Sequence, residues 1–188
     1  TCVVDRWGNA FSATPSDTLF GSPIVPNLGF LISSRGSQTW LEENHPSSLE
    51  PWKRPRLTPN PAMAFKNGKL FMTFGTPGGD TQCSSMLQLF LNVIEFDMTP
   101  QEAIEAPRFA PWNFPNSFWP HTYNPGRLDI EGRVPNTIFE DLVVLGHNVK
   151  KIEDWSAKMG SLSAILISDS GILVAGADPR RETYAIAR

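Results

Sequence analysis

The feature that most constrains the fold is a strand hairpin that leads through a glycine-rich turn into a helix. Two apolar runs, Ala62–Phe65 and Leu70–Phe74, flank a turn that contains Asn67-Gly68, and this pattern predicts a β-hairpin. The motif Gly75-Thr-Pro-Gly-Gly79 follows directly, and residues 81–96 then carry apolar side chains at helical spacing. The apolar face of this helix is wide, so we expect it to be buried on more than one side.

Further strands are predicted toward both ends of the chain, with the helices between them. Cys2–Val4 and Ala10–Thr14 form a hairpin around a turn at residues 5–9, and another strand is expected at Gly29–Ser33. This order is typical of an α+β fold in which the terminal strands share one sheet. The last predicted strands are Asn148–Ile152, Ser163–Ile167 and Gly171–Ala175.

Two shorter helices are also expected. Thr99-Pro100 with Glu102 predicts a capping box, and this helix ends before Pro107. Pro135–Leu145 reads as a second helix, which Gly146 closes. The segments 34–61 and 107–126 are read as a long loop and an irregular proline-rich segment. We expect one domain over residues 1–188.

Composition excludes several classes of function. Apolar residues make up 40% of the chain and charged residues 19%, which is typical of a globular protein. The net charge is −3 without a basic stripe, so nucleic acid is not an expected partner. No apolar run approaches the ~20 residues of a membrane span. Two cysteines and three histidines, without a CxxC or HExxH motif, predict neither a disulfide framework nor a metal site, and no cofactor is expected.

Thr1 is the first candidate for catalysis. An α-amino group ordinarily has a pKa of about 8, so a Thr at a chain start can carry both a nucleophilic hydroxyl and the base that activates it. Removal of a tag or of Met would also leave Thr first, and by itself that explanation is favoured over proteolytic maturation.

The glycine motif before the long helix is the second candidate. Consecutive glycines and a helix N-terminus can direct backbone N–H groups at an anion, including the oxyanion of a tetrahedral intermediate. A tight strand-to-helix turn without a ligand is the alternative. A further pair of motifs is interpreted as a buried ion-pair framework rather than as solvated turns. These motifs are Ala106-Pro-Arg-Phe109 and Ala177-Asp-Pro-Arg-Arg181.

Over nearly its whole length the sequence resembles the small subunit of the γ-glutamyltranspeptidase family. That resemblance implies an αββα N-terminal-nucleophile hydrolase sandwich, in which a proenzyme cleaves itself and exposes the nucleophilic Thr. A large subunit from the same precursor would complete the fold and the substrate pocket. The resemblance rests on the order and spacing of Val3-Val-Asp5, Gly8-Asn-Ala10, Lys53-Arg-Pro55, Gly75-Thr-Pro-Gly-Gly79, Leu91-Asn-Val-Ile-Glu-Phe96, Glu102-Ala-Ile-Glu-Ala-Pro-Arg-Phe109, Gly146-His147 and Ala177-Asp-Pro-Arg-Arg181.

The resemblance also assigns site residues. It implies that Gly78 and Gly79 form the oxyanion hole and that Ser16 supports the nucleophile. Asp17 or Thr18 occupies a substrate-binding position where an Asn is usual. A pair of substrate-binding Ser residues falls on residues 57–58, where only Thr58 keeps a hydroxyl.

Two departures from the family pattern matter. The family has about three more residues between its nucleophile and the Val-Val-Asp strand. If the chain begins after the true nucleophile, Thr1 is only a strand residue. We nevertheless expect Thr1 to be the nucleophile. Arg35 and Gln38 stand where the family grips a substrate ammonium with amide and acidic groups. An Arg repels an ammonium and binds a carboxylate, unless it faces solvent or pairs with an acid of the large subunit.

These residues predict an enzyme that hydrolyses a small carboxylate-bearing amide and releases ammonia, similar to the family's oxamate-cleaving amidohydrolases of purine catabolism. The alternatives are a γ-glutamyl hydrolase or transpeptidase that acts on glutathione-like donors, and an inactive family member with a binding role. We expect a large-subunit partner, with a dimer of heterodimers left open, no membrane association, and a cytoplasmic location.

Overall fold

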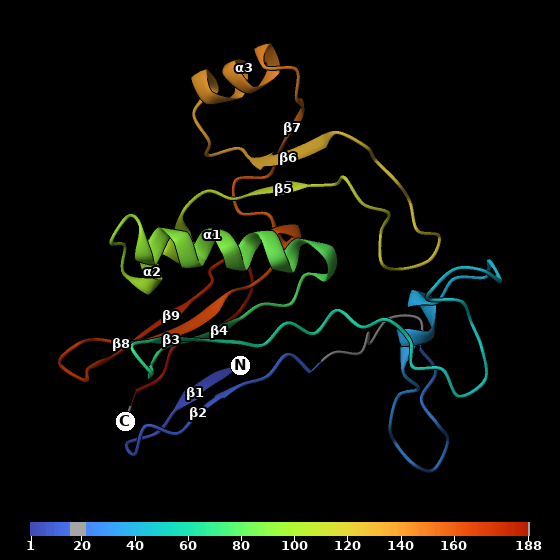
Figure 1. The fold of residues 1–188 in the computed structure, drawn as a ribbon, viewed down its shortest axis with the longest axis horizontal. Coiled ribbons are helices and arrows are strands. Elements are labelled where there is room, and N and C mark those ends of the chain that lie inside the picture. The colour runs from blue at the N-terminus through green and yellow to red at the C-terminus, as the bar shows by residue number, and fades with distance from the viewer. Residues whose placement is uncertain (16–21, 188) are drawn as a thin grey trace.

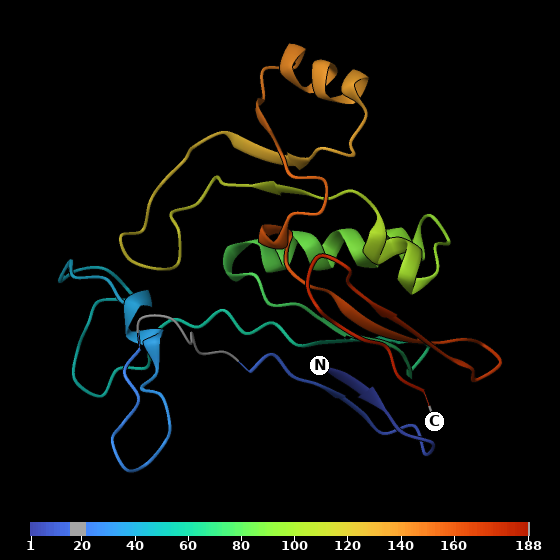
Figure 2. The ribbon, with the colours of Figure 1, turned by 180° about the vertical axis from the view of Figure 1, so that it is seen from behind.

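The computed structural model describes residues 1–15 and 22–187, and its central feature is a four-stranded antiparallel sheet (Figure 1). The helices α1 (Gln82–Ile94) and α2 (Pro100–Glu105) cover one face of this sheet. The hairpin β1 (Cys2–Val4) and β2 (Ala10–Ser12) packs on the other side, as both views show (Figures 1 and 2). In order across the sheet the strands are β3 (Ala62–Lys66), β4 (Lys69–Gly75), β8 (Ser163–Ile167) and β9 (Leu173–Ala177).

The core lies between this sheet and α1. Met72 and Phe74 of β4 are buried against Met86, Leu89 and Val93 of α1, which are spaced three and four residues apart on one helix face. The capping box predicted for α2 is confirmed, since the Thr99 side chain accepts from Glu102 N while the Glu102 carboxylate accepts from Thr99 N. The helices α1 and α2, the central sheet and the β1–β2 hairpin thus form one helical layer and two sheet layers of an αββα sandwich. This confirms the expected fold class.

A third sheet, of three strands, lies beyond α1 (Figure 1). Its strand β6 (Arg127–Glu131) pairs antiparallel with β5 (Phe109–Pro111) and parallel with β7 (Asn148–Ile152). The parallel pair is joined through α3 (Asn136–Val144), because parallel strands need a crossover. Neither β5 nor β6 is predicted from the sequence, because prolines flank both segments.

Two expectations about strands are wrong. The C-terminal strands β8 and β9 pair with β4, whereas β1 and β2 form a sheet of their own, so the terminal strands do not share one sheet. Residues 29–33 form no regular strand, since they contribute a single bridge, Ile24↔Leu31. The chain then enters a 3-10 helix, η1 (Ser34–Gln38), because the Ser33 side chain accepts from Arg35 N and caps it.

No helix in the described ranges is long and apolar enough to cross a membrane.

Candidate active site

The glycine motif occupies the turn between β4 and α1, as predicted. Gly78 has φ 140° and Gly79 has φ 58°, both in the region that favours glycine. A Cβ on Gly78 would lie 2.9 Å from Thr81 Oγ1 and 3.2 Å from Gly160 Cα, so a side chain does not fit there. Gly79 begins the 3-10 turn η2 (Gly79–Thr81), where backbone N–H groups have no partner inside the helix. These amides are therefore free of helical hydrogen bonds at the point where an anion could be bound.

The segment 158–161 holds this turn in place, a contribution that sequence reasoning missed. Ser161 N donates to Thr76 Oγ1 at 2.7 Å, and Thr81 Oγ1 donates to Lys158 O at 2.9 Å. A Cβ on Gly160 would lie 2.5 Å from Thr76 Oγ1, so the close approach requires glycine. No motif in the sequence signalled this contact, because the two segments are more than eighty positions apart.

The predicted ion-pair framework is confirmed, and it supports the segment 158–161. Arg108 Nη2 lies 2.7 Å from Asp178 Oδ2, and both side chains are buried. The same Arg108 donates through Nη1 to Met159 O at 3.0 Å, and burial lowers its pKa to about 10. Asp178 also accepts from Leu162 N at 2.8 Å and from Arg180 Nη1 at 3.2 Å. Glu131, which the motifs did not include, is the second carboxylate that binds Arg180.

Thr1 stands at the start of β1 and is paired with β2. Its amino group donates to Ala13 O at 2.9 Å, and Ala13 N donates back to Thr1 O at 2.9 Å. The next side chain, Cys2, turns toward the central sheet, where its thiol donates to Ser163 O at 3.4 Å. A neutral amine that donates one hydrogen to Ala13 O still has a lone pair, so this contact is compatible with a role as base.

Arg35 and Thr58 meet through a direct hydrogen bond. The Arg35 Nη1 donates to Thr58 Oγ1 at 3.1 Å and to Gln38 Oε1 at 3.3 Å. Arg35 is only 8% exposed, although it lies in the short helix η1, and its guanidinium lies 5.6 Å from the centre of the Phe118 ring. Gln38 is fully buried behind it, so Gln38 contacts Arg35 and is not part of the cavity wall.

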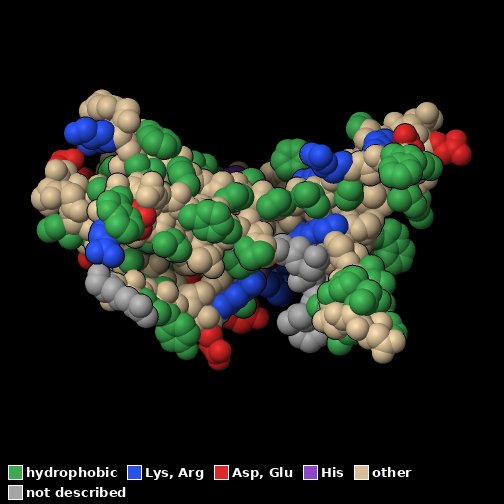
Figure 3. Space-filling view, turned by 90° about the horizontal axis from the view of Figure 1, so that it is seen from below, with side chains coloured by type: hydrophobic (Ala, Val, Ile, Leu, Met, Phe, Trp, Pro, Cys, Tyr) green, Lys and Arg blue, Asp and Glu red, His purple; other side chains and the backbone are tan. Residues whose placement is uncertain are grey.

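One cavity of about 930 Å³ brings most of the predicted residues together. Thr1, Arg35, Thr58, Gly78 and Gly79 all line it. Seen from below, Lys and Arg side chains gather near the centre of the face, between the body of the molecule and the arm formed by residues 22–60 (Figure 3). The predicted residues Ser16 and Asp17 lie outside the described residues. The wall also contains Gln82, Phe118 and Ser161, which sequence reasoning missed.

Phe118 is placed in this wall by a contact to the first turn after the glycines. Asp80 accepts hydrogen bonds from Ser117 N at 2.7 Å and from the Ser117 hydroxyl. The Phe118 ring then lies 3.7 Å from where a Gly79 Cβ would stand. The Phe118 ring therefore lies close to both the Arg35 guanidinium and the glycine turn.

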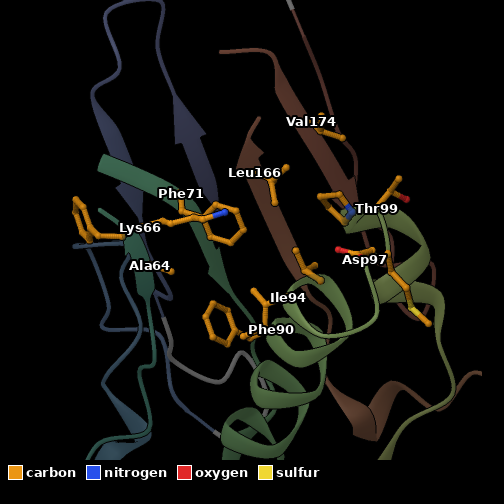
Figure 4. Close-up of a pocket in the computed structure, with 13 residues that line it drawn as sticks. Ala64, Lys66, Phe71, Phe90, Ile94, Asp97, Thr99, Leu166 and Val174 are labelled. Carbon is orange, nitrogen blue, oxygen red and sulfur yellow. The ribbon is translucent and has the colours of Figure 1, made fainter. Parts of the chain in front are cut away.

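A second cavity of about 590 Å³ lies between the central sheet and the end of α1 (Figure 4). Phe71 and Leu166 from the sheet face Phe90 and Ile94 from α1, so its wall is mainly apolar. Among residues 1–15 and 22–187, no three His, Cys, Asp or Glu side chains gather where they could hold a metal ion. The cavity that contains Thr1 and the glycine turn is the better candidate for catalysis.

Comparison with known proteins shows which family the sequence matches. The model of the family "Gamma-glutamyltranspeptidase" matches residues 1–188. The chain is 36% identical over 98% of its length to "Glutathione hydrolase-like YwrD proenzyme" of Bacillus subtilis (strain 168), and it spans 34% of that protein. It is 35% identical over 95% of its length to "Oxamate amidohydrolase proenzyme" of Klebsiella pneumoniae, of which it spans 33%. The chain thus covers about a third of these relatives.

Solved structures show the same fold. A structure described as "Structure of LmbA2991HD" superposes with a TM-score of 0.91 at 42% identity, over 100% of this chain and 33% of that one. An acivicin-inhibited gamma-glutamyltranspeptidase superposes with a TM-score of 0.78 at 28% identity. In that case the match covers 97% of this chain and 98% of the other, so the two chains have nearly the same extent.

Proposed function

We propose that this chain, which belongs to the gamma-glutamyltranspeptidase family, is the small subunit of an amidohydrolase that cleaves a small carboxylate-bearing amide such as oxamate. The observation that carries the proposal is the buried Arg35 guanidinium in the wall of the cavity that also holds Thr1 and the glycine turn. A cation at this place attracts a substrate carboxylate. A γ-glutamyl donor also has a carboxylate, but the ammonium on the same carbon weakens this attraction, and oxamate has no such ammonium.

The catalytic step follows from the groups around the cavity. Thr1 Oγ attacks the amide carbonyl while the Thr1 amine takes its proton, and the N–H groups of Gly78 and Gly79 stabilise the oxyanion. The amine then returns the proton to the nitrogen, ammonia leaves, and an acyl-enzyme ester remains. Water attacks this ester with the same amine as base, which releases the acid and restores Thr1.

Arg35 binds the substrate carboxylate in this proposal. Its hydrogen bonds to Thr58 Oγ1 and Gln38 Oε1 restrain the position of the guanidinium group. A fixed guanidinium loses less side-chain entropy when it binds a carboxylate through two N–H groups. Thr58 supports Arg35 in this role, where the family pattern places a hydroxyl for the substrate.

The partner in this proposal is a large subunit from the same precursor. Two relatives are named proenzymes, and the chain corresponds to about a third of each. The described residues also expose large apolar side chains in the hairpin β1–β2 and in the arm, including Trp7, Phe11, Leu41, Leu49 and Trp52. An exposed apolar surface of this kind is typical of a face that another chain covers.

Incubation of the assembled enzyme with oxamate and with a γ-glutamyl anilide tests the substrate. We expect ammonia from oxamate and little aniline from the anilide. Turnover of the anilide alone would contradict the carboxylate-amide proposal and would favour γ-glutamyl hydrolysis. One relative, of Bacillus subtilis (strain 168), is named "Glutathione hydrolase proenzyme". Turnover of neither would favour an inactive member of the family with a binding role.

A further inference from the structure

The ring of Phe118 reaches both parts of the Thr1 cavity on which the proposed function depends. The Arg35 guanidinium carbon lies over this ring, 5.6 Å from its centre. On the other side, Cε2 of the ring lies 3.7 Å from the position of a Gly79 Cβ. Phe118, Arg35 and Gly79 all line the same cavity, and the Phe118 side chain is only half-buried, so part of it is accessible to a ligand. One aromatic ring therefore borders both the carboxylate-binding group and the oxyanion hole.

Hydrogen bonds fix the backbone of Phe118 relative to the glycine turn. Asp80 follows Gly79 directly, and its carboxylate accepts from Ser117 N at 2.7 Å and from the Ser117 hydroxyl. Ser117 is 1% exposed, so water has little access to these bonds. Phe118 N donates to Asn116 Oδ1 at 2.8 Å. The ring is thus attached to a backbone that is tied to the residue after the oxyanion hole.

The residues after the ring are tied to η1, which carries Arg35. Trp119 N donates to Ser37 O at 2.7 Å, and His121 Nε2 donates to Thr39 O at 3.1 Å. This segment therefore connects the glycine turn with η1, and the ring lies between its two anchored ends. An aromatic side chain has only two torsions, so a fixed backbone leaves its ring few positions.

The placement of this ring restricts what can join the two ends of a substrate. When a carboxylate binds Arg35 and a carbonyl oxygen binds the N–H of Gly79, the atoms between these groups must lie in the part of the cavity that Phe118 lines. In oxamate the two carbons are bonded directly, whereas each further methylene requires extra room beside the ring. One methylene too many or too few in an apolar pocket changes kcat/KM about 10- to 200-fold.

We propose that Phe118 sets the length of the acyl group and selects amides whose carboxylate is bonded directly to the reacting carbonyl, an inference that rests on the proposed function. The role is steric, because the ring fills the space that a longer acyl chain would occupy. Removal of the ring should therefore help longer substrates. It would give no such help if the ring only supported the Arg35 guanidinium.

Three primary amides test this selection in the assembled enzyme. Oxamate, malonamate and succinamate all carry a carboxylate and release ammonia, and they differ by one methylene at each step. We expect kcat/KM of the unaltered enzyme to fall about tenfold or more with each methylene. Equal values for the three, or a preference for succinamate, would overturn the inference about Phe118 and leave the proposed function. Release of ammonia from none of them would overturn both.

Phe118→Ala should remove much of this preference. The ratio of kcat/KM for oxamate to that for succinamate should fall about tenfold or more, because succinamate gains the space of the ring. Phe118→Leu leaves a smaller apolar side chain in place, so it should shift the ratio in the same direction by less. This second variant provides the test if Phe118→Ala does not assemble.

Phe114→Ala is the matched control, because Phe114 belongs to the same proline-rich segment but is 84% exposed and is not part of the cavity wall. It should leave the ratio of oxamate to succinamate unchanged. An unchanged ratio in the Phe118 variants as well would overturn the inference. Equal losses on all three amides would in that case show that the ring acts through Arg35 and not on the acyl chain.

Discussion

At the scale of single residues, Thr1 carries the most chemistry and the most specific hypothesis. Its amine and carbonyl pair with Ala13, so Thr1 is at once the start of a β-ladder and part of the cavity wall. Two hypotheses therefore differ in which residue supplies the nucleophile. Either Thr1 itself supplies the nucleophile, or it is a ladder residue and the nucleophile precedes it.

Replacement of Thr1 by Ala in the full precursor distinguishes these hypotheses. If Thr1 is the nucleophile of self-cleavage, Thr1→Ala leaves the precursor intact and the enzyme inactive, and Thr1→Ser keeps part of both functions because it keeps a hydroxyl. Gel electrophoresis, mass spectrometry of the new N-terminus and an ammonia assay check this. Normal cleavage of Thr1→Ala at another Thr would refute the assignment.

Arg35 is the residue that sets the expected acyl specificity. Arg35→Gln removes the cation and should lower kcat/KM for oxamate roughly 100-fold, mostly through KM, because a carboxylate would lose its charged partner. Arg35→Lys should recover only part of this loss, since an ammonium cannot make a two-pronged contact.

The control for these variants is Arg6→Gln, an exposed arginine beside Trp7 in the β1–β2 turn, which should leave the kinetics unchanged. Steady-state rates of ammonia release measure all three variants. An Arg35→Gln enzyme with unaltered KM for oxamate would show that the guanidinium does not bind the substrate.

At the scale of elements, the sequence predicted local units well and their partners poorly. The α2 capping box, the β3–β4 hairpin and α1 follow from signals within a few residues of one another, and all three are present. The pairing of β4 with β8 and the packing of residues 158–161 on the glycine turn join distant segments, for which short-range patterns carry no information.

The candidate site divides in the same way. Gly78, Gly79, Arg35 and Thr58 could be predicted because family spacing marks them, and the cavity brings them together. Gln82, Phe118 and Ser161 enter the wall only because other elements position them, and in the sequence each resembles an ordinary helix or loop residue. Ser161 in particular lies in a stretch of small residues that has no motif of its own.

The buried ion pairs connect these elements, and Asp178→Asn tests their contribution. This change takes a carboxylate from both Arg108 and Arg180, so two buried cations lose a partner. We expect the free energy of unfolding to fall by about 3–5 kcal/mol. Activity should fall too, because Arg108 also holds Met159 O in the segment that braces the glycine turn.

Thermal unfolding of the assembled enzyme measures this effect. Asp169→Asn, which changes an exposed carboxylate in the turn between β8 and β9, is the control and should alter Tm little. Similar Tm values for the two variants would show that the buried network does not stabilise the fold.

At the scale of the whole molecule, helices cover the outer face of the central sheet but not that of the β1–β2 hairpin. The central sheet has α1 and α2 on its outer face, whereas the outer face of the β1–β2 hairpin exposes the cross-strand pair Val3 and Phe11, at 49% and 60%. An αββα sandwich requires a further helical layer on that side. The chain supplies about a third of its relatives' length, so we expect the large subunit to provide this layer.

Phe11→Asp tests that arrangement, because it places a charge in the centre of the surface that the large subunit is expected to bury. Desolvation of an unpaired carboxylate costs several kcal/mol, so the two chains should no longer elute together in size-exclusion chromatography after coexpression. Val144→Asp makes the same chemical change on α3, at a residue that is 86% exposed and far from the hairpin, and should leave assembly intact. Assembly by both variants alike would place the large subunit on another face, and hydrogen exchange of residues 1–12 in the assembled enzyme would then remain as fast as in an exposed hairpin.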